Sequence, residues 1–356
     1  MWLHEFQAQG LRCFKHIHAT FSSGVNVLYG DNGVGKTSIL EGISVLSCGK
    51  SFRTSKLSHV INDQINELTL FGEVQTKDNS TLLGIQHKQG VTELRVDRQK
   101  VSKWSQLAKN LPILEIHPES YLLITGGPIE RRKFLNWGMF HVEPSYGKLW
   151  LEYNRALKQR NHCLRHRHIN QASNWHQNIA ELGNKIVNYL EEYTNNLKPY
   201  LNEITELFQL SGKFTMKYYP GWDQQSELYQ LLNLELQQEE IGLSTMHGPH
   251  RGDLKLMLNN KLFSKSSSRG QQKVLAIALK IAQAKYLKQN SGKESIYLID
   301  ELPAELDQKR REIALNLLTQ LNTQIIISAV SKDSVKYTNS DTKWFHVEQG
   351  CVTSMV

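Results

Sequence analysis

Apolar and polar positions alternate along the start of the chain, which is the pattern of short β-strands. We expect strands over 2–6 and 13–17, a turn over 7–10, and a third strand at Val25–Tyr29. The third stretch is more continuously apolar, as a strand buried on both faces should be. In 38–46 the apolar residues recur at three- and four-residue intervals, which predicts a helix directly after a glycine-rich turn.

The same pattern divides the rest of the chain. Alternation over 68–101 predicts a meander of antiparallel strands, and the apolar run 113–116 predicts another strand. From 128 to 208 glycine is scarce and apolar residues follow helical spacing, so we expect long amphipathic helices ending near Pro199. Residues 213–242 give no clear prediction, and α/β character returns from 246. We therefore expect three segments, 1–125, 126–242 and 243–356.

Composition sets the broad class. The 356 residues are 40% hydrophobic and 21% charged, which excludes a disordered or fibrous chain. No apolar run approaches the ~20 residues of a membrane span, and the first residues show no export signal. The four cysteines lie far apart, which argues against zinc or a disulfide framework. We expect a soluble cytoplasmic protein with no membrane partner, and its formal charge of +8 permits a polyanionic partner without requiring one.

The glycine-rich turn matches the phosphate-binding (Walker A) pattern G-x-x-x-x-G-K-[ST] in full. It stands between an apolar strand and a periodic helix, which is the context that separates a true phosphate loop from a chance match. Backbone N–H groups and the helix N-terminus favour phosphate, Lys36 would reach the β- and γ-phosphates, and Thr37 would offer a hydroxyl to Mg²⁺. The predicted nucleotide-binding residues are Gly30, Asp31, Asn32, Gly33, Val34, Gly35, Lys36 and Thr37.

A second apolar strand, 295–299, ends in the adjacent carboxylates of Asp300 and Glu301. Alone, such a strand is usually one that meets solvent. Paired with the phosphate loop it is the expected Walker B segment, in which Asp300 holds Mg²⁺ with Thr37 and Glu301 polarises the attacking water. The predicted catalytic residues are therefore Glu301, Lys36 and Asp300.

A third feature selects among nucleotide-binding folds. Ser268, Arg269, Gly270 and Gln271 stand at the start of a predicted helix, where helix capping alone would explain the serine. Next to both Walker motifs, the segment resembles the signature motif of ATP-binding-cassette ATPases. That resemblance implies contact with the γ-phosphate bound by a second subunit, and two ATP molecules held within a C2 dimer. Residues 304–307, ending in Asp307, match the D-loop of that interface.

Basic residues provide candidate DNA contacts. The stretch 155–168 contains no acidic residue and could follow a phosphate backbone, although a solvated helix face explains it about as well. A second candidate group follows the first predicted helix. The candidates are Arg155, Lys158, Arg160, Arg165 and Arg167 in the first group, and Arg53 and Lys56 in the second.

Together these segments resemble the RecF family of bacterial recombination mediators, which is related to the SMC and RecN ATPases. The resemblance covers nearly the whole chain and implies an α/β fold: an ABC-type P-loop ATPase head with a mixed sheet, an antiparallel N-terminal meander and a helical insertion or arm. The first and third segments would form the head, and 126–242 the arm. The segments that carry it are the opening strands, 30–37, 117–119, 128–135, 248–251, 268–273 and 300–307.

The resemblance also implies a function. ATP with Mg²⁺ would drive homodimerisation that clamps DNA, and weak DNA-stimulated hydrolysis would release it. The family role would be gap repair, replication restart and SOS induction, with RecR as direct partner and a link to RecA loading. Gly252 departs from the family pattern, which usually has Asp at this position.

Two alternatives stay open at this stage. An ATPase subunit of another complex, such as a transporter, would carry a glutamine at the lobe junction and a switch histidine. Neither is evident, since 117–119 reads His-Pro-Glu and the apolar strand 324–329 ends without histidine. A nucleotide-gated DNA-binding scaffold with negligible hydrolysis is the second alternative. In the RecF-like interpretation, the missing switch histidine favours slow hydrolysis, with ATP acting more as a dimer clamp than as an energy source for movement.

Overall fold

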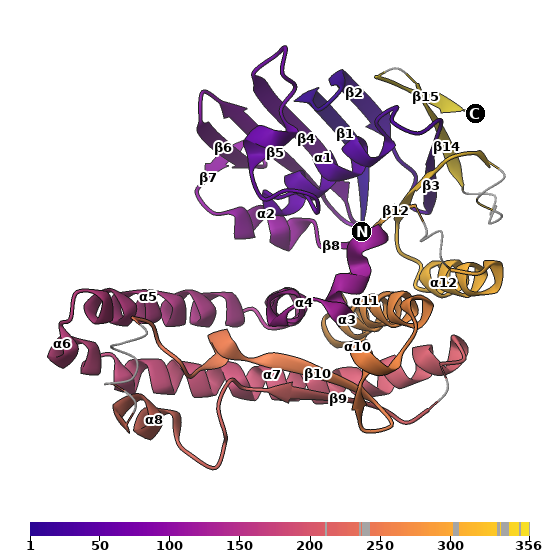
Figure 1. Cartoon of the computed structure of the whole chain (residues 1–356). Coiled ribbons are helices and arrows are strands. Elements are labelled where there is room, and N and C mark those ends of the chain that lie inside the picture. The colour runs from indigo at the N-terminus through magenta and orange to yellow at the C-terminus, as the bar shows by residue number, and fades with distance from the viewer. Residues whose placement is uncertain are drawn as a thin grey trace. The chain divides into compact units, whose positions relative to one another are not determined.

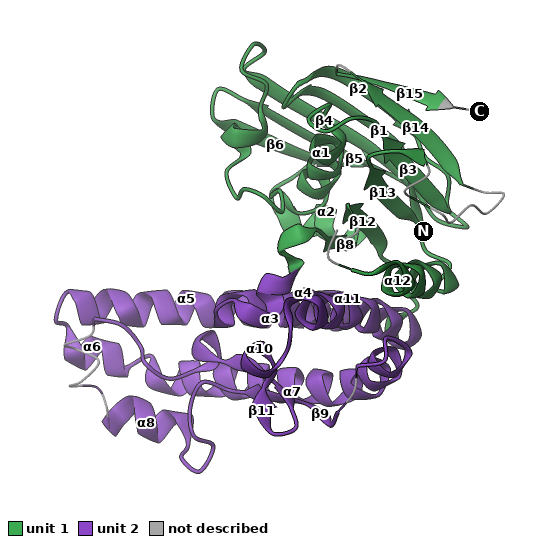
Figure 2. Cartoon of the chain, turned by 45° about the vertical axis from the view of Figure 1, so that its right-hand side comes forward, with its two compact units in different colours: residues 1–120, 291–356 green, residues 121–290 purple. Residues whose placement is uncertain are grey.

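A computed structural model describes residues 1–210, 212–234, 236, 243–301, 306–332, 335, 342–348 and 350–355. The chain forms two compact units, Met1–Ser120 with Ser291–Val356, and Tyr121–Asn290 (Figures 1 and 2). Residues 243–290 thus belong to the second unit, although we expected them in the segment that completes the head. The segment boundary that we expected after residue 242 adjoins residues 237–242, which lie outside the described residues. The assignment of 243–290 to an ATPase head stays a prediction.

The first unit contains two six-stranded sheets. One is antiparallel, in the order β2-β1-β4-β5-β6-β7, which confirms the expected N-terminal meander. Every second residue of β4 is buried, as its alternating sequence predicts. The strands are β1 (Trp2–Leu11), β2 (Phe14–Thr20), β4 (Glu67–Gln75), β5 (Ser80–Lys88), β6 (Val91–Val96) and β7 (Gln99–Val101).

The second sheet of this unit has the order β15-β14-β3-β13-β12-β8, and only the β14–β15 pair is antiparallel. Parallel pairing of β3, β13 and β12 brings their carboxyl ends to the same edge. Its strands are β3 (Val25–Tyr29), β8 (Ile113–Ile116), β12 (Ile296–Asp300), β13 (Ile325–Ala329), β14 (Lys343–Glu348) and β15 (Cys351–Met355).

Helix α1 (Lys36–Cys48) contacts strands of both sheets (Figure 1). Its side chains are buried on nearly all sides, which is the expected state of a helix between two sheets. Ile39 and Ile43 belong to one core cluster with Phe6 of the first sheet and Leu298 of the second. The loop before α1 is therefore fixed by a rigid core. The other helices of this unit are α2 (Trp104–Asn110) and α12 (Gln308–Gln320).

The second unit is mainly helical. Helix α7 runs through Pro199 to Leu207, so the expected end near Pro199 is wrong. The buried face continues beyond the proline with Leu201 and Ile204, and this packing outweighs the lost backbone hydrogen bond. Among the described residues of this unit, the α-helices are α3 (Leu122–Thr125), α4 (Pro128–Val142), α5 (Tyr146–Arg165), α6 (Ile169–Ser173), α7 (His176–Leu207), α8 (Leu228–Leu234), α10 (Phe263–Ser266) and α11 (Arg269–Ser291).

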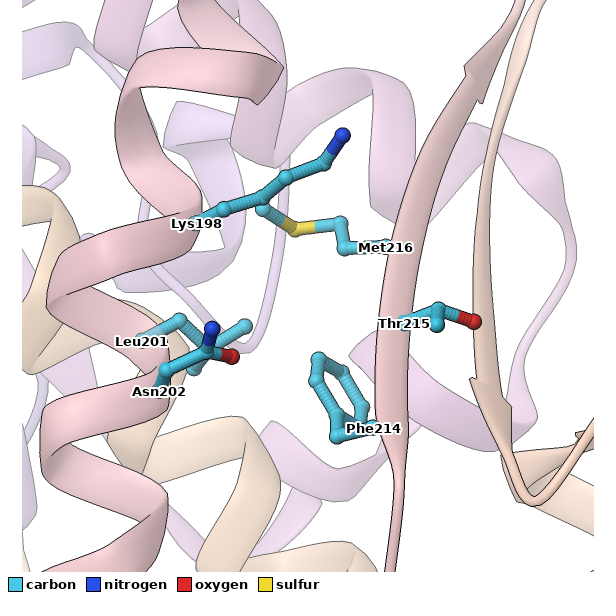
Figure 3. A pocket seen from close by; sticks show the side chains of 6 residues that line it. All are labelled: Lys198, Leu201, Asn202, Phe214, Thr215 and Met216. Atoms are coloured by element: carbon cyan, nitrogen blue, oxygen red, sulfur yellow. The ribbon is translucent and has the colours of Figure 1, made fainter.

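A three-stranded antiparallel sheet completes the second unit in the order β11-β10-β9. Its strands are β9 (Phe214–Tyr219), β10 (Asp253–Leu258) and β11 (Lys261–Leu262). Between α7 and β9 lies a cavity of about 160 Å³, into which Phe214, Met216 and Leu201 point (Figure 3). Among the described residues, none of the helices combines the length and hydrophobicity that a membrane span needs.

A buried polar network around His250 holds the 3₁₀ turn Pro249–Arg251 in the second unit. His250 Nδ1 lies 2.7 Å from the Tyr153 hydroxyl and Nε2 lies 3.2 Å from the Thr245 carbonyl, so both ring nitrogens have a hydrogen-bond partner. Burial, with Arg251 and two further arginines nearby, lowers the pKa of His250 from 6.5 to about 4. The contacts of His250 therefore tie this turn to Tyr153 of α5 and to the Thr245 backbone.

This pKa predicts a pH-dependent stability. The folded pKa lies below the unfolded one, so between pH 6.5 and 4 the unfolded chain binds the proton more readily. Neutral His250 contributes its full stabilisation above pH 6.5. This contribution decreases as the pH falls from 6.5 to about 4, by at most ~1.4 kcal/mol per pH unit. We expect urea unfolding to show that the stability gap between wild type and His250→Asn shrinks on acidification. A gap that stays constant between pH 7 and 4.5 would contradict this.

Candidate functional site

The loop between β3 and α1 needs glycine at two positions. Gly30 (φ 151°) faces the Val347 carbonyl so closely that a Cβ would lie 2.2 Å from the oxygen. Gly35 (φ 111°) precedes α1, and a Cβ there would meet the Phe14 ring at 2.4 Å. Both positions also have positive φ, which side chains disfavour. The backbone is thus free to wrap closely around an anion at the start of α1.

Lys36 is the first residue of α1, directly after this loop, and is only 5% exposed. Its ammonium donates to the carbonyls of Gly30 (2.7 Å) and Asp31 (2.8 Å). Burial lowers the pKa of Lys36, while the carboxylates of Glu301, Asp300 and Asp31 oppose that shift. The cation is therefore held beside the loop by fixed dipoles, with carboxylates close enough to influence its charge.

The two Walker segments meet through Thr37 and Asp300, which lie 263 positions apart in sequence. Thr37 Oγ1 donates to Asp300 Oδ1 at 2.8 Å. Ser328 is paired in register with Asp300 on the neighbouring strand β13, and its hydroxyl donates to the same oxygen at 2.9 Å. The Glu301 amide in turn donates to Ser328 Oγ at 2.9 Å. Sequence reasoning missed Ser328, although it is the polar residue of an otherwise apolar strand.

The donor set of Thr37 and Asp300 fits Mg²⁺. This ion prefers hard oxygen ligands and usually takes one or two protein groups, with phosphate oxygens and water completing its shell. No group of three or more His, Cys, Asp or Glu side chains among the described residues could hold a metal by itself. The arrangement therefore suits a metal that arrives with a nucleotide.

Glu301 follows Asp300 at the end of β12 and is exposed. Its backbone adopts φ 48°, the left-handed region that non-glycine residues seldom occupy. Such strain is concentrated at functional sites and persists where surrounding contacts enforce it, here the hydrogen bond from its amide to Ser328. Residues 302–305, which follow, lie outside the described part of the chain.

Ser268 and Gln271 cap helix α11 reciprocally. The Ser268 hydroxyl accepts from the Gln271 amide (3.3 Å), and the Gln271 side chain accepts from the Ser268 amide (2.9 Å). This is a capping box, so the capping interpretation of the serine is confirmed. Ser268 and Arg269 remain exposed and Gly270 half-buried, which leaves the helix N-terminus open to an anion.

Asp307 has a similar capping role in the first unit. Its side chain accepts a hydrogen bond from the Arg310 amide at 2.8 Å, and Asp307 is thus the N-cap of helix α12. Ala304 and Glu305 of the expected D-loop lie outside the described residues. Leu306, which is 1% exposed, anchors the described end of that segment in the core.

The candidate DNA contacts separate into exposed and buried positions. The prediction for Arg160 is wrong, because its side chain is 0% exposed and donates to Thr245 Oγ1 at 2.7 Å. It lies on the same face of α5 as the buried Tyr153 and Leu164. The remaining candidates are all exposed: Arg155, Lys158, Arg165, Arg167, Arg53 and Lys56.

Comparison with known proteins agrees with this geometry. The family model of the RecF/RecN/SMC N terminal domain matches residues 2–353. A DNA replication and repair protein RecF from Shewanella frigidimarina is 38% identical over 93% of each chain. One from Pseudomonas entomophila is 37% identical over 99% of this chain and 98% of its own.

Solved structures give the same result. The recombination mediator protein RecF-ATP in the RecFOR pathway superposes with a TM-score of 0.89 at 25% identity, covering 100% of this chain and 98% of its own. An Smc head bound to the C-winged helix domain of ScpA shares the fold at a TM-score of 0.60. These matches confirm the expected ABC-type ATPase head with its mixed sheet and helical part. The chain belongs to the RecF family.

Proposed function

We propose that this protein is an ATP-dependent DNA-binding protein of recombinational repair, in which ATP drives dimerisation around DNA. The hydrogen bond between Thr37 and Asp300 carries the proposal, since it joins the phosphate loop to the second Walker segment at 2.8 Å. Curated relatives at 37–38% identity are named DNA replication and repair proteins, which supports the DNA-directed part.

Within this proposal each group around the loop has one task. The loop backbone binds the phosphates, and the Lys36 ammonium pairs with the β- and γ-phosphate oxygens. Thr37 and Asp300 would hold Mg²⁺, which neutralises phosphate charge when bound. Ser328 orients the Asp300 carboxylate through its 2.9 Å hydrogen bond. Glu301 accepts the proton of the attacking water as general base.

Closure of the site would require a second copy of the chain. Ser268, at the N-terminus of α11, would donate to the γ-phosphate held by the partner, with Asp307 near the same interface. The open end of that helix supports this role, because its dipole and free N–H groups attract anions. Hydrolysis would be slow and DNA-stimulated, so ATP would act mainly as a clamp.

We propose that the exposed Arg155, Lys158, Arg165 and Arg167 of the second unit, and Arg53 and Lys56 of the first, contact DNA phosphates. The solved relatives described as recombination mediators of the RecFOR pathway support RecR as a direct partner. A functional link to RecA loading, gap repair, replication restart and SOS induction, in the cytoplasm, belongs to the same proposal.

Replacing Ser268 by arginine is expected to abolish ATP-dependent dimerisation. The larger cation would collide with the partner's nucleotide, while the same chain's phosphate loop would be untouched. Light scattering with MgATP should show the wild type as a dimer and Ser268→Arg as a monomer. ATP affinity of the monomer should stay within about threefold.

Ser266→Arg is the matched control, because Ser266 is exposed two residues earlier in the chain and this substitution introduces the same charge and side-chain size. It should dimerise like the wild type. A Ser268→Arg protein that still dimerises with MgATP would refute the clamp. A wild type that dimerises but shows no measurable hydrolysis, with or without duplex DNA, would favour the scaffold alternative.

A further inference from the structure

The β9–β10–β11 sheet turns one face to the core of the second unit and the other to solvent. Met216 and Tyr218 of β9 and Leu254 and Leu256 of β10 are buried. Figure 3 shows Phe214 and Met216 pointing toward α7 and Thr215 pointing away from it. Because strand side chains alternate, Lys217 and Tyr219 share the outer face with Thr215. Both are exposed.

Two lysines lie directly opposite each other on this outer face. Lys217 of β9 is the register partner of Lys255 of β10. Like charges at directly opposed positions destabilise a strand pair. Among the described residues neither lysine has an acidic partner. Asp253 is on the same face, but the Arg131 guanidinium holds both of its oxygens, at 2.6 and 3.1 Å. In the part of this unit that the structure describes, no carboxylate is thus paired with either lysine to offset their repulsion.

An exposed aromatic ring adjoins the lysine pair. Tyr219 is 37% exposed, and the ammonium of Lys255 lies 4.6 Å from its ring centroid. This cation–π contact orients the ring, and the tyrosine remains partly exposed to solvent. Sheet surfaces that combine a basic track with exposed aromatic rings bind single-stranded nucleic acids, since bases can stack on the rings.

We propose that Lys217, Tyr219 and Lys255, the outer β9–β10 face, form a contact site for single-stranded DNA. The lysines would pair with two successive phosphates, and Tyr219 would stack on an unpaired base. An acidic protein would satisfy the lysines but leave the ring unused. Duplex DNA keeps its bases stacked internally and offers the ring no partner. The combination therefore favours single-stranded DNA.

The inference rests on the proposed function only for the choice of DNA as the polyanion. All three residues lie in the second unit, so the face is complete in a single chain. Binding through it requires neither ATP nor dimerisation. This separates it from the clamp, which requires both.

The test is a salt titration of an oligo-dT 20-mer against the nucleotide-free protein. The double variant Lys217→Ala/Lys255→Ala should lower the log–log salt slope by about 1.4, because each single-strand phosphate contact contributes about 0.7. Affinity near physiological salt should fall on the order of tenfold. Lys133→Ala/Lys148→Ala is the matched control, since both lysines are exposed in the same unit and already face Glu130 and Glu152.

A second variant isolates the stacking contact. Tyr219→Leu should weaken oligo-dT binding roughly five- to hundredfold while leaving the salt slope unchanged, because no charge is removed. Tyr229→Leu replaces a tyrosine that is 43% exposed elsewhere in the unit and should have no effect.

The possible outcomes are distinct. If the double lysine variant matches its control in slope and affinity, the site does not exist. If the lysine effect appears equally with duplex DNA and Tyr219→Leu is silent, the single-strand assignment is wrong. If the variants lose oligo-dT binding but still dimerise with MgATP, this inference holds independently of the clamp. Failure of the wild type to dimerise would refute the clamp and leave this site intact.

Discussion

Lys36→Ala is expected to reduce ATP affinity by on the order of 10²–10³-fold, the scale of losing one member of a buried charge pair. The wild-type ammonium is 5% exposed and held by two loop carbonyls, so it meets phosphate oxygens with little reorganisation. Alanine removes that charge and leaves both carbonyls unpaired, which also costs about 1–3 kcal/mol of stability. Isothermal titration with ATP and Mg²⁺ would measure the loss.

The control for this prediction is Lys15→Ala. Lys15 is an exposed lysine of the same unit, on strand β2, and its removal changes the net charge equally. It should bind ATP as the wild type does. Urea unfolding checks that Lys36→Ala remains folded at the assay temperature. A folded Lys36→Ala protein with unchanged ATP affinity would remove the phosphate loop from the mechanism.

Glu301→Gln is expected to slow ATP hydrolysis by about 10²–10⁴-fold, the usual contribution of a general base. Glutamine has the same shape and can occupy the same left-handed backbone position, where the Glu301 amide donates to Ser328. It cannot accept the proton of the attacking water. Binding of ATP should change little, so the ATP-bound dimer should persist longer. Single-turnover hydrolysis and the dimer lifetime, with and without duplex DNA, are the measurements.

Glu312→Gln serves as the matched control, because Glu312 is exposed on α12 and the substitution is chemically identical. Its turnover should equal that of the wild type. Equal turnover for Glu301→Gln would assign the base elsewhere. A wild-type rate that does not respond to DNA would count against the DNA-stimulated part of the proposal.

Each motif that predicts the nucleotide site is local in sequence, which is why the sequence could indicate it. Residues 30–35 form one continuous loop whose glycine positions have defined backbone requirements, and Lys36 and Thr37 begin α1. The short apolar run 296–299 is typical of a buried strand. The hydrogen bond between Ser328 and Asp300 could not be predicted from the sequence. It depends on the order of strands in a parallel sheet, which places β13 beside β12 and which no motif in the sequence reveals.

The helical unit was predicted less well, for two physical reasons. The basic stretch 155–168 was judged by composition, whereas spacing separates its residues: Arg160 falls in the apolar row of Tyr153, Leu157 and Leu164. Strand β9 has six residues, so its alternation of apolar and polar positions was too short to be distinguished from the polar sequence around it. Helix α7 passed through Pro199 because long-range packing outweighed a local preference.

The interleaving of the two units has a consequence during synthesis. Strand β8 is made early, yet its partner β12 is separated from it by the whole second unit. Ribosomes add about 5–20 residues per second. Asp300 lies 263 positions after Thr37 and is therefore translated roughly 13–53 s later. During that time the nascent chain carries β3 and β8, two of the six strands of this sheet, which do not pair with each other. Asp300 and Ser328 are thus translated only after the whole second unit, and a chain that stops before β12 lacks the second Walker segment.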